Sequence, residues 1–332
     1  MSAIPPPPDD FWSRRLNAPA HRQTFTALDM LVEAAANEAG LAAAARLSAA
    51  RFGHDAGREV APAAHLTQVT AAGPAEPAPA DWPERLRYAG TGEWISLSIG
   101  EWGHGVGRLA DRQAFAVLAP ALAAQPRLVS RYLIDHYVLN FLFRDWAMLH
   151  ASVLLDAAGR TLLALVGDHN TGKSTTALRL LRAGWRFLAD GMLLFQPRGG
   201  GLACSGYPLG EVKLRDDVLA AFPEYAGERE QRKTVVDLRA AHRERVVEAV
   251  VTPAALQLCF VQRGDGPRTA LAPLAGEEAR QAVAAYTVYW DEPQRLRANS
   301  RALEQLLETA RCHTLRLGAD PAGLLDTLET LR

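Results

Sequence analysis

The sequence predicts a mixed α/β protein, and three observations support this. The apolar segment Leu162 to Val166 leads into a loop, residues 167–172, after which Ser174 to Ala183 has apolar side chains at helical spacing. Two apolar segments, Ala151 to Leu155 and Thr161 to Val166, are separated by a short glycine-containing loop, which predicts an antiparallel hairpin. The second half alternates strand-like and helix-like patterns, which favours parallel strands beside that hairpin.

The first part of the chain, residues 1–84, is expected to hold an arm, a helix and a linker. Residues 1–20 contain Pro5 to Pro8, which predicts a mobile arm. Residues 24–50 are rich in Ala and Leu, which favour a helix. Residues 71–84 are rich in Pro and Ala, as is typical of a linker.

Residues 85–148 are expected to form a strand-and-helix subdomain that packs on the core. Polar and apolar residues alternate from Glu93 to Ile99, and Ala114 to Leu118 is apolar, so both segments predict strands. Gly103 to Arg108 contains three glycines and predicts a turn. Arg127 to Asp145 predicts a long, largely buried helix, because few polar residues interrupt its apolar positions.

Residues 149–332 are expected to form the main domain. Within it, Leu256 to Val261 and His313 to Leu317 predict strands. Helices are predicted to begin near Asp291 and Asp320, because a proline closely follows each of these residues.

Composition excludes several classes of protein. The 332 residues include 36 basic and 37 acidic side chains, and this balance argues against a broad nucleic-acid-binding surface. No apolar run reaches the length of about 18 residues that a membrane helix needs, and the start lacks a signal-peptide pattern. Cys204, Cys259 and Cys312 fit neither a disulfide framework nor a zinc site, so we expect three buried, reduced thiols in a cytoplasmic protein.

The segment from Gly167 to Thr175 matches the pattern Gly-x4-Gly-Lys-Ser/Thr. Glycines let backbone N–H groups approach a phosphate, and the N-terminus of the following helix adds partial positive charge. Lys173 can reach the β- and γ-phosphates of a nucleotide, and the Ser174 hydroxyl can bind Mg²⁺. Asn170 stands where glycine is common, and Asn tolerates a positive φ. We therefore expect ATP and Mg²⁺ as cofactors, held by Gly167, Asn170, Thr171, Gly172, Lys173, Ser174 and Thr175.

An acidic residue follows the loop at a suggestive spacing. Residues 186–189 predict a strand that ends at Asp190, eighteen residues after Gly172. A carboxylate at the end of a neighbouring strand would face the phosphates, where it could bind Mg²⁺ or accept a proton from an attacking hydroxyl. The alternative is that Asp190 only caps a turn before Gly191.

The residues from Leu149 to about Phe195 resemble the HPr kinase/phosphorylase family and its wider group of related kinases. The resemblance lies in Leu149-His-Ala-Ser152, in the phosphate loop and in Arg182-Ala-Gly-Trp-Arg-Phe-Leu-Ala-Asp190. A looser likeness continues through Gly206-Tyr-Pro208, Lys213-Leu-Arg215 and Leu315-Arg-Leu-Gly318. It implies a mixed-sheet P-loop core with flanking helices, of the type that HPr kinases share with phosphoenolpyruvate carboxykinases.

The resemblance also implies roles for single residues. Lys173 would hold the phosphates, and Ser174 and Asp190 would bind Mg²⁺. Asp190 would also be the general base for a substrate hydroxyl. His150 would lie near the reacting phosphate or orient Asp190; otherwise it is an ordinary histidine at the start of a strand. By analogy with true HPr kinases, the chain would form a homo-oligomer.

Three departures separate this chain from true HPr kinases. Gly191 replaces a second Asp, which leaves open a weak or inactive enzyme. Thr175 replaces the acidic residue that follows the Lys-Ser pair. The glycine-rich signature on the C-terminal side has no counterpart. We therefore do not expect the acceptor to be HPr.

Two functions remain open from the sequence. The first is an ATP-dependent kinase that transfers the γ-phosphoryl group to a hydroxyl of a peptide, protein or small molecule. The second is a non-catalytic nucleotide-binding module that recruits a peptide or carrier protein. A GTPase is disfavoured because no lysine of the chain follows an Asn, as the base-reading motif requires.

Two further cations could contribute to either function. Lys213 and Arg215 are two positions apart, which places both on one face of a strand. They could contact phosphates or an acidic substrate, or they could be solvated surface charges. Neither a nucleic acid nor a membrane is expected as a partner.

Overall fold

The computed structural model describes residues 19–54, 63–70, 82–288, 293–320 and 322–331. Two compact units divide the chain, the first ending at Leu142 and the second beginning at Phe143. The predicted arm and most of the predicted linker lie outside the described residues. Across the described ranges, no helix combines the length and the apolar character that crossing a membrane requires.

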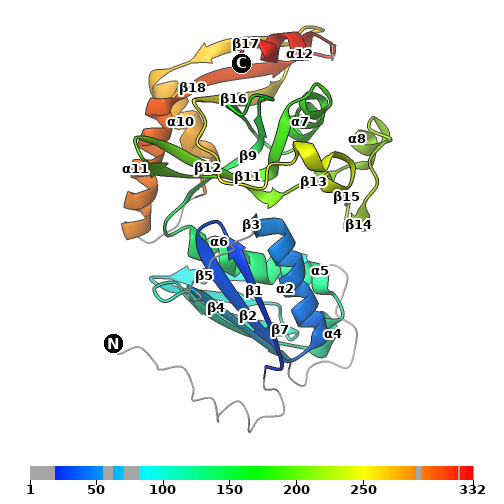
Figure 1. Ribbon diagram of the computed structural model, residues 1–332, viewed down its shortest axis with the longest axis vertical. Helices are drawn as coiled ribbons and strands as arrows, with labels where there is room; N and C mark the ends of the chain where they lie inside the picture. Colours follow the sequence, from blue (N-terminus) through cyan, green and yellow to red (C-terminus); the bar gives the residue numbers. More distant parts are fainter. Residues whose placement is uncertain (1–18, 55–62, 71–81, 289–292, 321, 332) are drawn as a thin grey trace. The chain divides into compact units, whose positions relative to one another are not determined.

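The first unit is built around one mixed sheet of eight strands in the order β3-β1-β2-β4-β8-β7-β6-β5 (Figure 1). Its elements are β1 (His21–Ala27), β2 (Met30–Ala36), α2 (Ala39–Phe52), β3 (Gly53–His54), β4 (Ala64–Thr70), α3 (Trp82–Arg85), β5 (Arg87–Thr91), β6 (Trp94–Ser98), β7 (Gly103–Arg108), β8 (Gln113–Leu118), α4 (Pro120–Ala123), α5 (Pro126–Val129), a π-helical segment (Ser130–Ile134) and α6 (Asp135–Leu142). The strands β2, β4 and β8 run parallel, and the other pairs are antiparallel.

Helices α2 and α6 cover the same face of this sheet. Phe52 of α2 stacks on Phe25 of β1, with ring centroids 6.3 Å apart. Tyr137 of α6 lies against Gly105 and Gly107 of β7, which the sheet register places on the same face as Phe25. The helical run predicted for Arg127 to Asp145 is observed from Pro126 to Leu142, although Ser130–Ile134 is π-helical.

Two predictions for this unit are wrong. Residues 24–50 are not one helix: they form β1, β2 and most of α2, because the buried side chains of Ala34, Ala35 and Ala36 belong to a strand packed beneath a helix. The expected division between residues 1–84 and 85–148 is not observed either, since β4 and β8 pair directly in one sheet. Tertiary packing overrides the helical preference of alanine here.

The segment Gly103–Arg108 is strand β7, not the predicted turn. A Cβ at Gly107 would lie 2.9 Å from Cε1 of Tyr137, so the glycine makes room for an aromatic ring against the sheet. The strands predicted at Glu93 to Ile99 and Ala114 to Leu118 are confirmed as β6 and β8, with Ile95 and Leu97 buried on the covered face.

The second unit holds a seven-stranded sheet in the order β12-β11-β9-β10-β16-β18-β17 and a separate antiparallel sheet, β13-β15-β14. Its elements are β9 (Ala147–Leu155), β10 (Thr161–Val166), α7 (Lys173–Arg182), β11 (Arg186–Arg198), β12 (Gly201–Leu209), β13 (Glu211–Leu214), α8 (Asp216–Ala220), β14 (Glu228–Glu230), β15 (Lys233–Asp237), α9 (Arg239–His242), a 3-10 turn (Arg243–Arg245), β16 (Ala255–Arg263), β17 (Ala270–Leu274), α10 (Gly276–Tyr286), α11 (Pro293–Thr309), β18 (Ala310–Leu317) and α12 (Ala322–Glu329).

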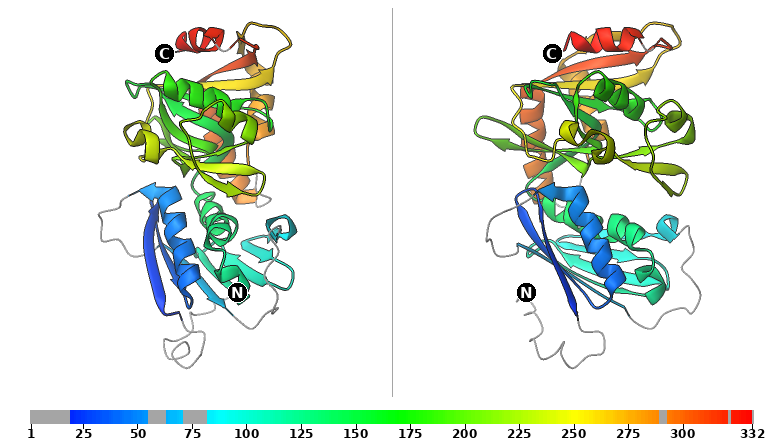
Figure 2. Two further views of the ribbon diagram at one scale, coloured as in Figure 1. Left: turned by 90° about the vertical axis from the view of Figure 1, so that its right-hand side faces the viewer. Right: turned by 45° about the vertical axis from the view of Figure 1, so that its right-hand side comes forward.

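The predicted mixed α/β class is confirmed at this level. The hairpin of β9 and β10 is antiparallel, whereas β10, β16 and β18 run parallel. One face of the sheet packs with α10 and α11, and the other with α7, α12 and the small sheet (Figures 1 and 2). Cys204, Cys259 and Cys312 are buried and free, as predicted.

Strand β11 differs from the prediction at the point that matters for function. It does not end at Asp190 but continues to Arg198, with its register to β12 shifted between Ala189 and Met192. Asp190 therefore lies inside a strand, at an irregularity, rather than at a strand end. The alternative that Asp190 caps a turn before Gly191 is wrong for the same reason.

Candidate functional site

The loop that joins β10 to α7 has the backbone that its glycines predict. Gly167 and Gly172 have φ values of 152° and 106°, a range that side chains disfavour. Asn170 has φ 65°, so the non-glycine residue expected to tolerate a positive φ adopts one. Helix α7 begins at Lys173 directly after this loop, so the free N–H groups of its first turn border the loop.

Lys173 is buried, and its ammonium group folds back onto its own loop. Nζ donates to the backbone carbonyl oxygens of Gly167, at 2.7 Å, and of Asp168, at 2.8 Å. Burial lowers the pKa of Lys173, the carboxylates of Asp190 and Asp168 oppose this shift, and the charge of Lys233 adds to it. The charge is thus held inside the loop by neutral backbone acceptors.

Asp190 links three elements of the unit through its two carboxylate oxygens. Ser174, in the first turn of α7, donates its hydroxyl to Oδ2 of Asp190 at 2.8 Å. Ser152 of β9, which lies opposite Asp190 in the β9–β11 ladder, donates its hydroxyl to Oδ1. The structure therefore brings Lys173, Ser174 and Asp190 together at one end of the loop.

His150 and His169 lie beside this group, with ring centroids 5.5 Å apart. Burial lowers the pKa of His150, and the charges of Lys173 and His169 lower it further. Asp190 and a hydrogen bond with the Gly191 backbone act in the opposite direction. His150 is thus close to Asp190 and Lys173.

The position after Asp190 has no room for a side chain. A Cβ on Gly191 would lie 2.8 Å from the carbonyl oxygen of Tyr207 and 3.1 Å from Cδ of Pro208, both in the adjacent strand β12. A second acidic residue at 191 would therefore require the backbone of β12 to move.

Three polar contacts hold the middle of the loop. Thr171 donates its hydroxyl to the carbonyl oxygen of Asp168 at 2.9 Å. The backbone oxygen of Asn170 accepts from Nε of Arg263 at 3.0 Å, and its side-chain oxygen accepts from Nη1 of Arg215 at 3.3 Å. Thr175 is half-buried in the first turn of α7.

The two downstream cations differ in position. Arg215 reaches the loop through Asn170, although its guanidinium also forms an ion pair with Asp217. Lys213 is paired with Glu230, which β14 contributes to the small sheet. Arg215 follows β13 rather than extending it, so the prediction that both lie on one strand face is wrong.

Sequence reasoning missed Ser152 and Tyr286. Burial raises the pKa of Tyr286, at the end of α10, and the charge of Asp168 and a hydrogen bond with its side chain raise this pKa further. Ser152 had a signal that was available: it is a lone hydroxyl in the otherwise apolar stretch Ala151 to Leu155. The Tyr286 contact joins segments more than a hundred positions apart and had no such signal.

The donor set at Asp190 suits a hard cation bound together with a ligand. Among the described residues, no group of three His, Cys, Asp or Glu side chains could hold a metal by itself. When phosphates and waters supply most of its ligands, Mg²⁺ needs only one or two oxygen atoms from the protein. The Asp190 carboxylate and the Ser174 hydroxyl, whose oxygens are 2.8 Å apart, could provide them.

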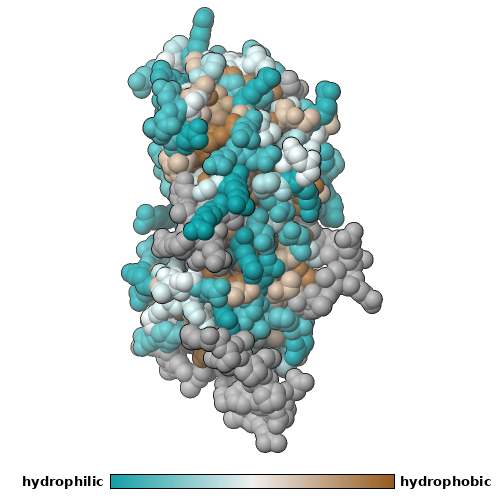
Figure 3. Space-filling model, turned by 90° about the vertical axis from the view of Figure 1, so that its left-hand side faces the viewer, coloured by the Kyte–Doolittle hydropathy of each residue, from teal (hydrophilic) through white to brown (hydrophobic). Residues whose placement is uncertain are grey.

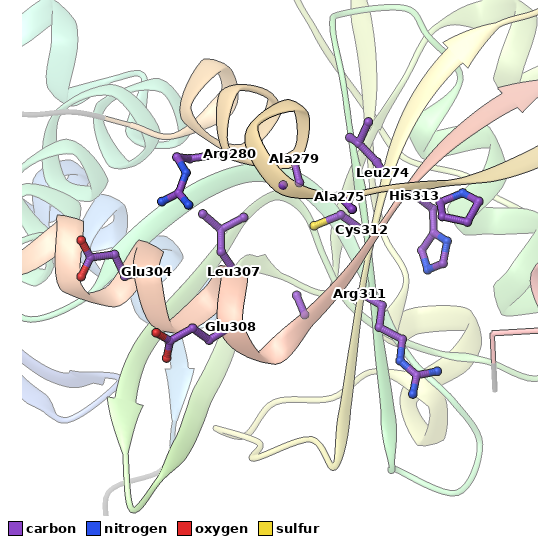
Figure 4. Close-up of a pocket in the computed structure, with 13 residues that line it drawn as sticks. Leu274, Ala275, Ala279, Arg280, Glu304, Leu307, Glu308, Arg311, Cys312 and His313 are labelled. Atoms are coloured by element: carbon purple, nitrogen blue, oxygen red, sulfur yellow. The ribbon is translucent and has the colours of Figure 1, made fainter.

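A separate groove of about 600 Å³ lies between α10, α11 and the start of β18. Ala279, Leu307 and Cys312 face one space, and Glu308 and Arg311 lie at its border (Figure 4). On the side where α11 lies in Figure 1, hydrophobic side chains are surrounded by hydrophilic ones (Figure 3). The groove shares no residue with the loop site.

No family model and no curated protein matches the chain. Among solved structures, the chain is similar to the HPr(Ser) kinase/phosphatase from Coxiella burnetii, with 13% sequence identity and a TM-score of 0.32. That match covers 55% of this chain and 92% of the other.

Proposed function

We propose that this chain is an ATP-dependent kinase of the HPr-kinase-related type. It transfers the γ-phosphoryl group of ATP to a hydroxyl of a peptide, protein or small molecule other than HPr. The observation that carries the proposal is the 2.8 Å hydrogen bond between Ser174 and Asp190, which joins the helix N-terminus after the glycine loop to a carboxylate. A glycine-rich loop with only a structural role would not require this hydrogen bond.

The loop residues supply the binding part of this function. The N–H groups from Gly167 to Ser174 and the α7 N-terminus attract phosphate oxygens, and Lys173 exchanges its carbonyl acceptors for them. Arg215 and Arg263, both bonded to Asn170, add positive charge beside the loop. Ser174 and Asp190 would hold Mg²⁺, which neutralises charge on the β- and γ-phosphates when bound.

Asp190 supplies the acid–base part. In the transfer, the acceptor hydroxyl gives its proton to Asp190 while its oxygen bonds to the γ-phosphorus. The bond from that phosphorus to the β–γ bridging oxygen breaks, and ADP leaves. His150 borders the reacting groups and its lowered pKa favours the neutral ring, which adds no further positive charge beside Lys173.

Calorimetry and phosphotransfer together test this proposal. The wild-type chain is titrated with ATP and ADP, with and without Mg²⁺, and is then incubated with γ-labelled ATP and a panel of hydroxyl acceptors. Asp190→Asn should retain nucleotide binding and lose transfer by about 100-fold or more, as expected on removal of a general base. Arg182→Ala is the matched control, because it removes a charge from the far end of α7, where Arg182 pairs with Glu224.

The outcomes separate the two functions that the sequence left open. Heat of binding with transfer to one acceptor supports the kinase. Binding without turnover on any acceptor would support the non-catalytic module instead. Absence of nucleotide binding by the wild-type chain would overturn both.

A further inference from the structure

Because Gly191 has no room for a side chain, Asp190 has no second acidic residue beside it in β11. Tyr207, whose carbonyl oxygen would meet a side chain at 191, pairs with Met192 in the β11–β12 ladder. The obstacle is therefore backbone held in a sheet, not a flexible side chain. A kinase that works here must orient a single carboxylate without help from a neighbouring acid.

The Ser152 hydroxyl is placed to provide that orientation. Ser152 has no exposed surface, and its neighbours Val153 and Leu154 are equally buried in the two apolar layers beside the sheet. Leaving a hydroxyl unpaired in such surroundings is costly, and an alanine would pack there without that cost. Among the described residues, the Ser152 hydroxyl has one hydrogen-bond partner, Oδ1 of Asp190.

The two hydroxyls on Asp190 differ in what holds them. Ser152 belongs to the central strand β9, which pairs on both sides, with β10 and β11. Ser174 belongs to the first turn of α7, which borders the loop where phosphates would bind. A fixed hydroxyl therefore holds Oδ1, and Oδ2 faces the side from which a ligand approaches.

We infer that Ser152 is the positioning residue of Asp190: it fixes Oδ1 from the rigid strand and so presents Oδ2 to the metal and to the acceptor hydroxyl. This inference rests on the proposed function. In this inference, the hydroxyl of Ser152 orients the carboxylate of Asp190, which has no second acidic residue beside it. Without that hydroxyl, Asp190 can rotate away from Ser174.

The test replaces Ser152 and measures metal binding apart from catalysis. Mn²⁺ serves as a spectroscopic probe for Mg²⁺, and its affinity for the ADP-loaded protein is read by electron paramagnetic resonance. Ser152→Ala should bind ADP without metal as tightly as wild type. It should lose about 10- to 100-fold in Mn²⁺ affinity, the usual effect of removing a hydrogen-bond partner of a metal ligand. In the kinase assay kcat should fall by a similar factor, while KM for ATP changes little.

Ser205→Ala is the matched control. Ser205 is equally buried, in strand β12 of the same sheet, and within the described structure its hydroxyl has no hydrogen-bond partner. This variant should leave Mn²⁺ affinity and kcat unchanged. Ser152→Thr restores a hydroxyl on a side chain that suits a strand, so it should regain most of the Mn²⁺ affinity lost by Ser152→Ala.

The results distinguish the inference from the proposed function. If the wild-type chain binds no nucleotide, both are wrong. If wild type binds and transfers but Ser152→Ala matches Ser205→Ala in Mn²⁺ affinity and kcat, only the positioning role is wrong. If Ser152→Ala lowers the unfolding temperature and Ser152→Thr restores stability without restoring Mn²⁺ affinity, the hydroxyl is merely structural and the inference is again overturned.

Discussion

Among the described residues, each unit of the molecule buries one cation, and the two cations have different partners. Arg51, at the end of α2 in the first unit, forms an ion pair with Asp135 at 2.6 Å and also contacts Ser130. Lys173, at the start of α7 in the second unit, donates to two backbone carbonyls of its own loop. The charge of Arg51 is neutralised within the fold, whereas Lys173 keeps neutral acceptors that an anion can replace. A buried charge thus indicates function when its partners are exchangeable.

The largest effect on stability is expected when the ion pair between Arg51 and Asp135 is broken. Asp135→Asn leaves the Arg51 charge buried without its carboxylate, which should lower the free energy of unfolding by about 3–5 kcal/mol. Urea unfolding monitored by circular dichroism measures this loss. The double replacement of Arg51→Met with Asp135→Leu should recover much of it, because two apolar side chains leave no unpaired charge. Nucleotide affinity at low urea should not change; a parallel loss of affinity would contradict the contrast between the two cations.

The corresponding change in the second unit should affect binding rather than stability. Lys173→Met removes a charge that is placed to bind a phosphate, so phosphotransfer should fall by about 100- to 1,000-fold. The free energy of unfolding should change by about 1 kcal/mol or less, since no carboxylate loses an ion pair. Transfer assays and urea unfolding of the same preparation check both. A stability loss as large as that of Asp135→Asn would show that the two cations have the same role.

A smaller effect is expected at Gly191, where the site has no spare volume. Gly191→Ala should lower the free energy of unfolding by about 1–3 kcal/mol, because the new Cβ meets the backbone of β12. Gly266→Ala is the control: a Cβ there has no atom within 4 Å. Thermal unfolding compares the two. Equal unfolding temperatures would mean that β12 yields easily and that the single-carboxylate site is not fixed by packing.

An effect of similar size depends on pH and extends the comparison to a buried histidine of the first unit. Burial lowers the pKa of His136 in α6 to about 4 from the ordinary 6.5. Between these values the unfolded chain binds more protons than the native state, so stability rises with pH and is lost as pH falls through this window. The loss should be on the order of 2 kcal/mol, given the partial exposure of the ring.

His136→Phe tests this assignment. The ring stacks on Tyr88, with centroids 3.7 Å apart, and a phenyl ring can keep that contact without titrating. Comparing urea unfolding of both proteins at pH 7 and pH 4.5 isolates the contribution of the histidine. A wild-type loss no larger than that of His136→Phe would assign the acid sensitivity to other groups.

The elements that the sequence predicted well are those whose local pattern agrees with their packing. The hairpin of β9 and β10, helix α7, and strands β16 and β18 follow buried apolar periodicity, and the sequence predicted each of them. Strand β7 was not predicted, because its glycines, Gly105 and Gly107, make room for Tyr137 of α6, which lies about thirty positions away in the sequence. A prediction based only on the residues around a glycine cannot take that contact into account.

The candidate site shows the same limit. The residues of one contiguous motif, from Gly167 to Ser174, could be predicted because their chemistry depends on spacing alone. Asp190 was found as a residue, but its setting inside β11 was not, since an irregular register depends on two neighbouring strands. Ser152 stands out in the sequence as a lone hydroxyl, but its contact with Asp190 follows from the pairing of β9 with β11.

The close fit of Gly191 against Tyr207 and Pro208 also constrains how this sequence can change. Replacing Pro208 would remove the Cδ contact at 3.1 Å, but the backbone carbonyl oxygen of Tyr207 would still meet a Cβ at 2.8 Å, so an acidic residue at 191 would require a shift of the β12 backbone. Directed evolution toward a two-acid centre should therefore start from a library that varies the whole of β12 together with position 191.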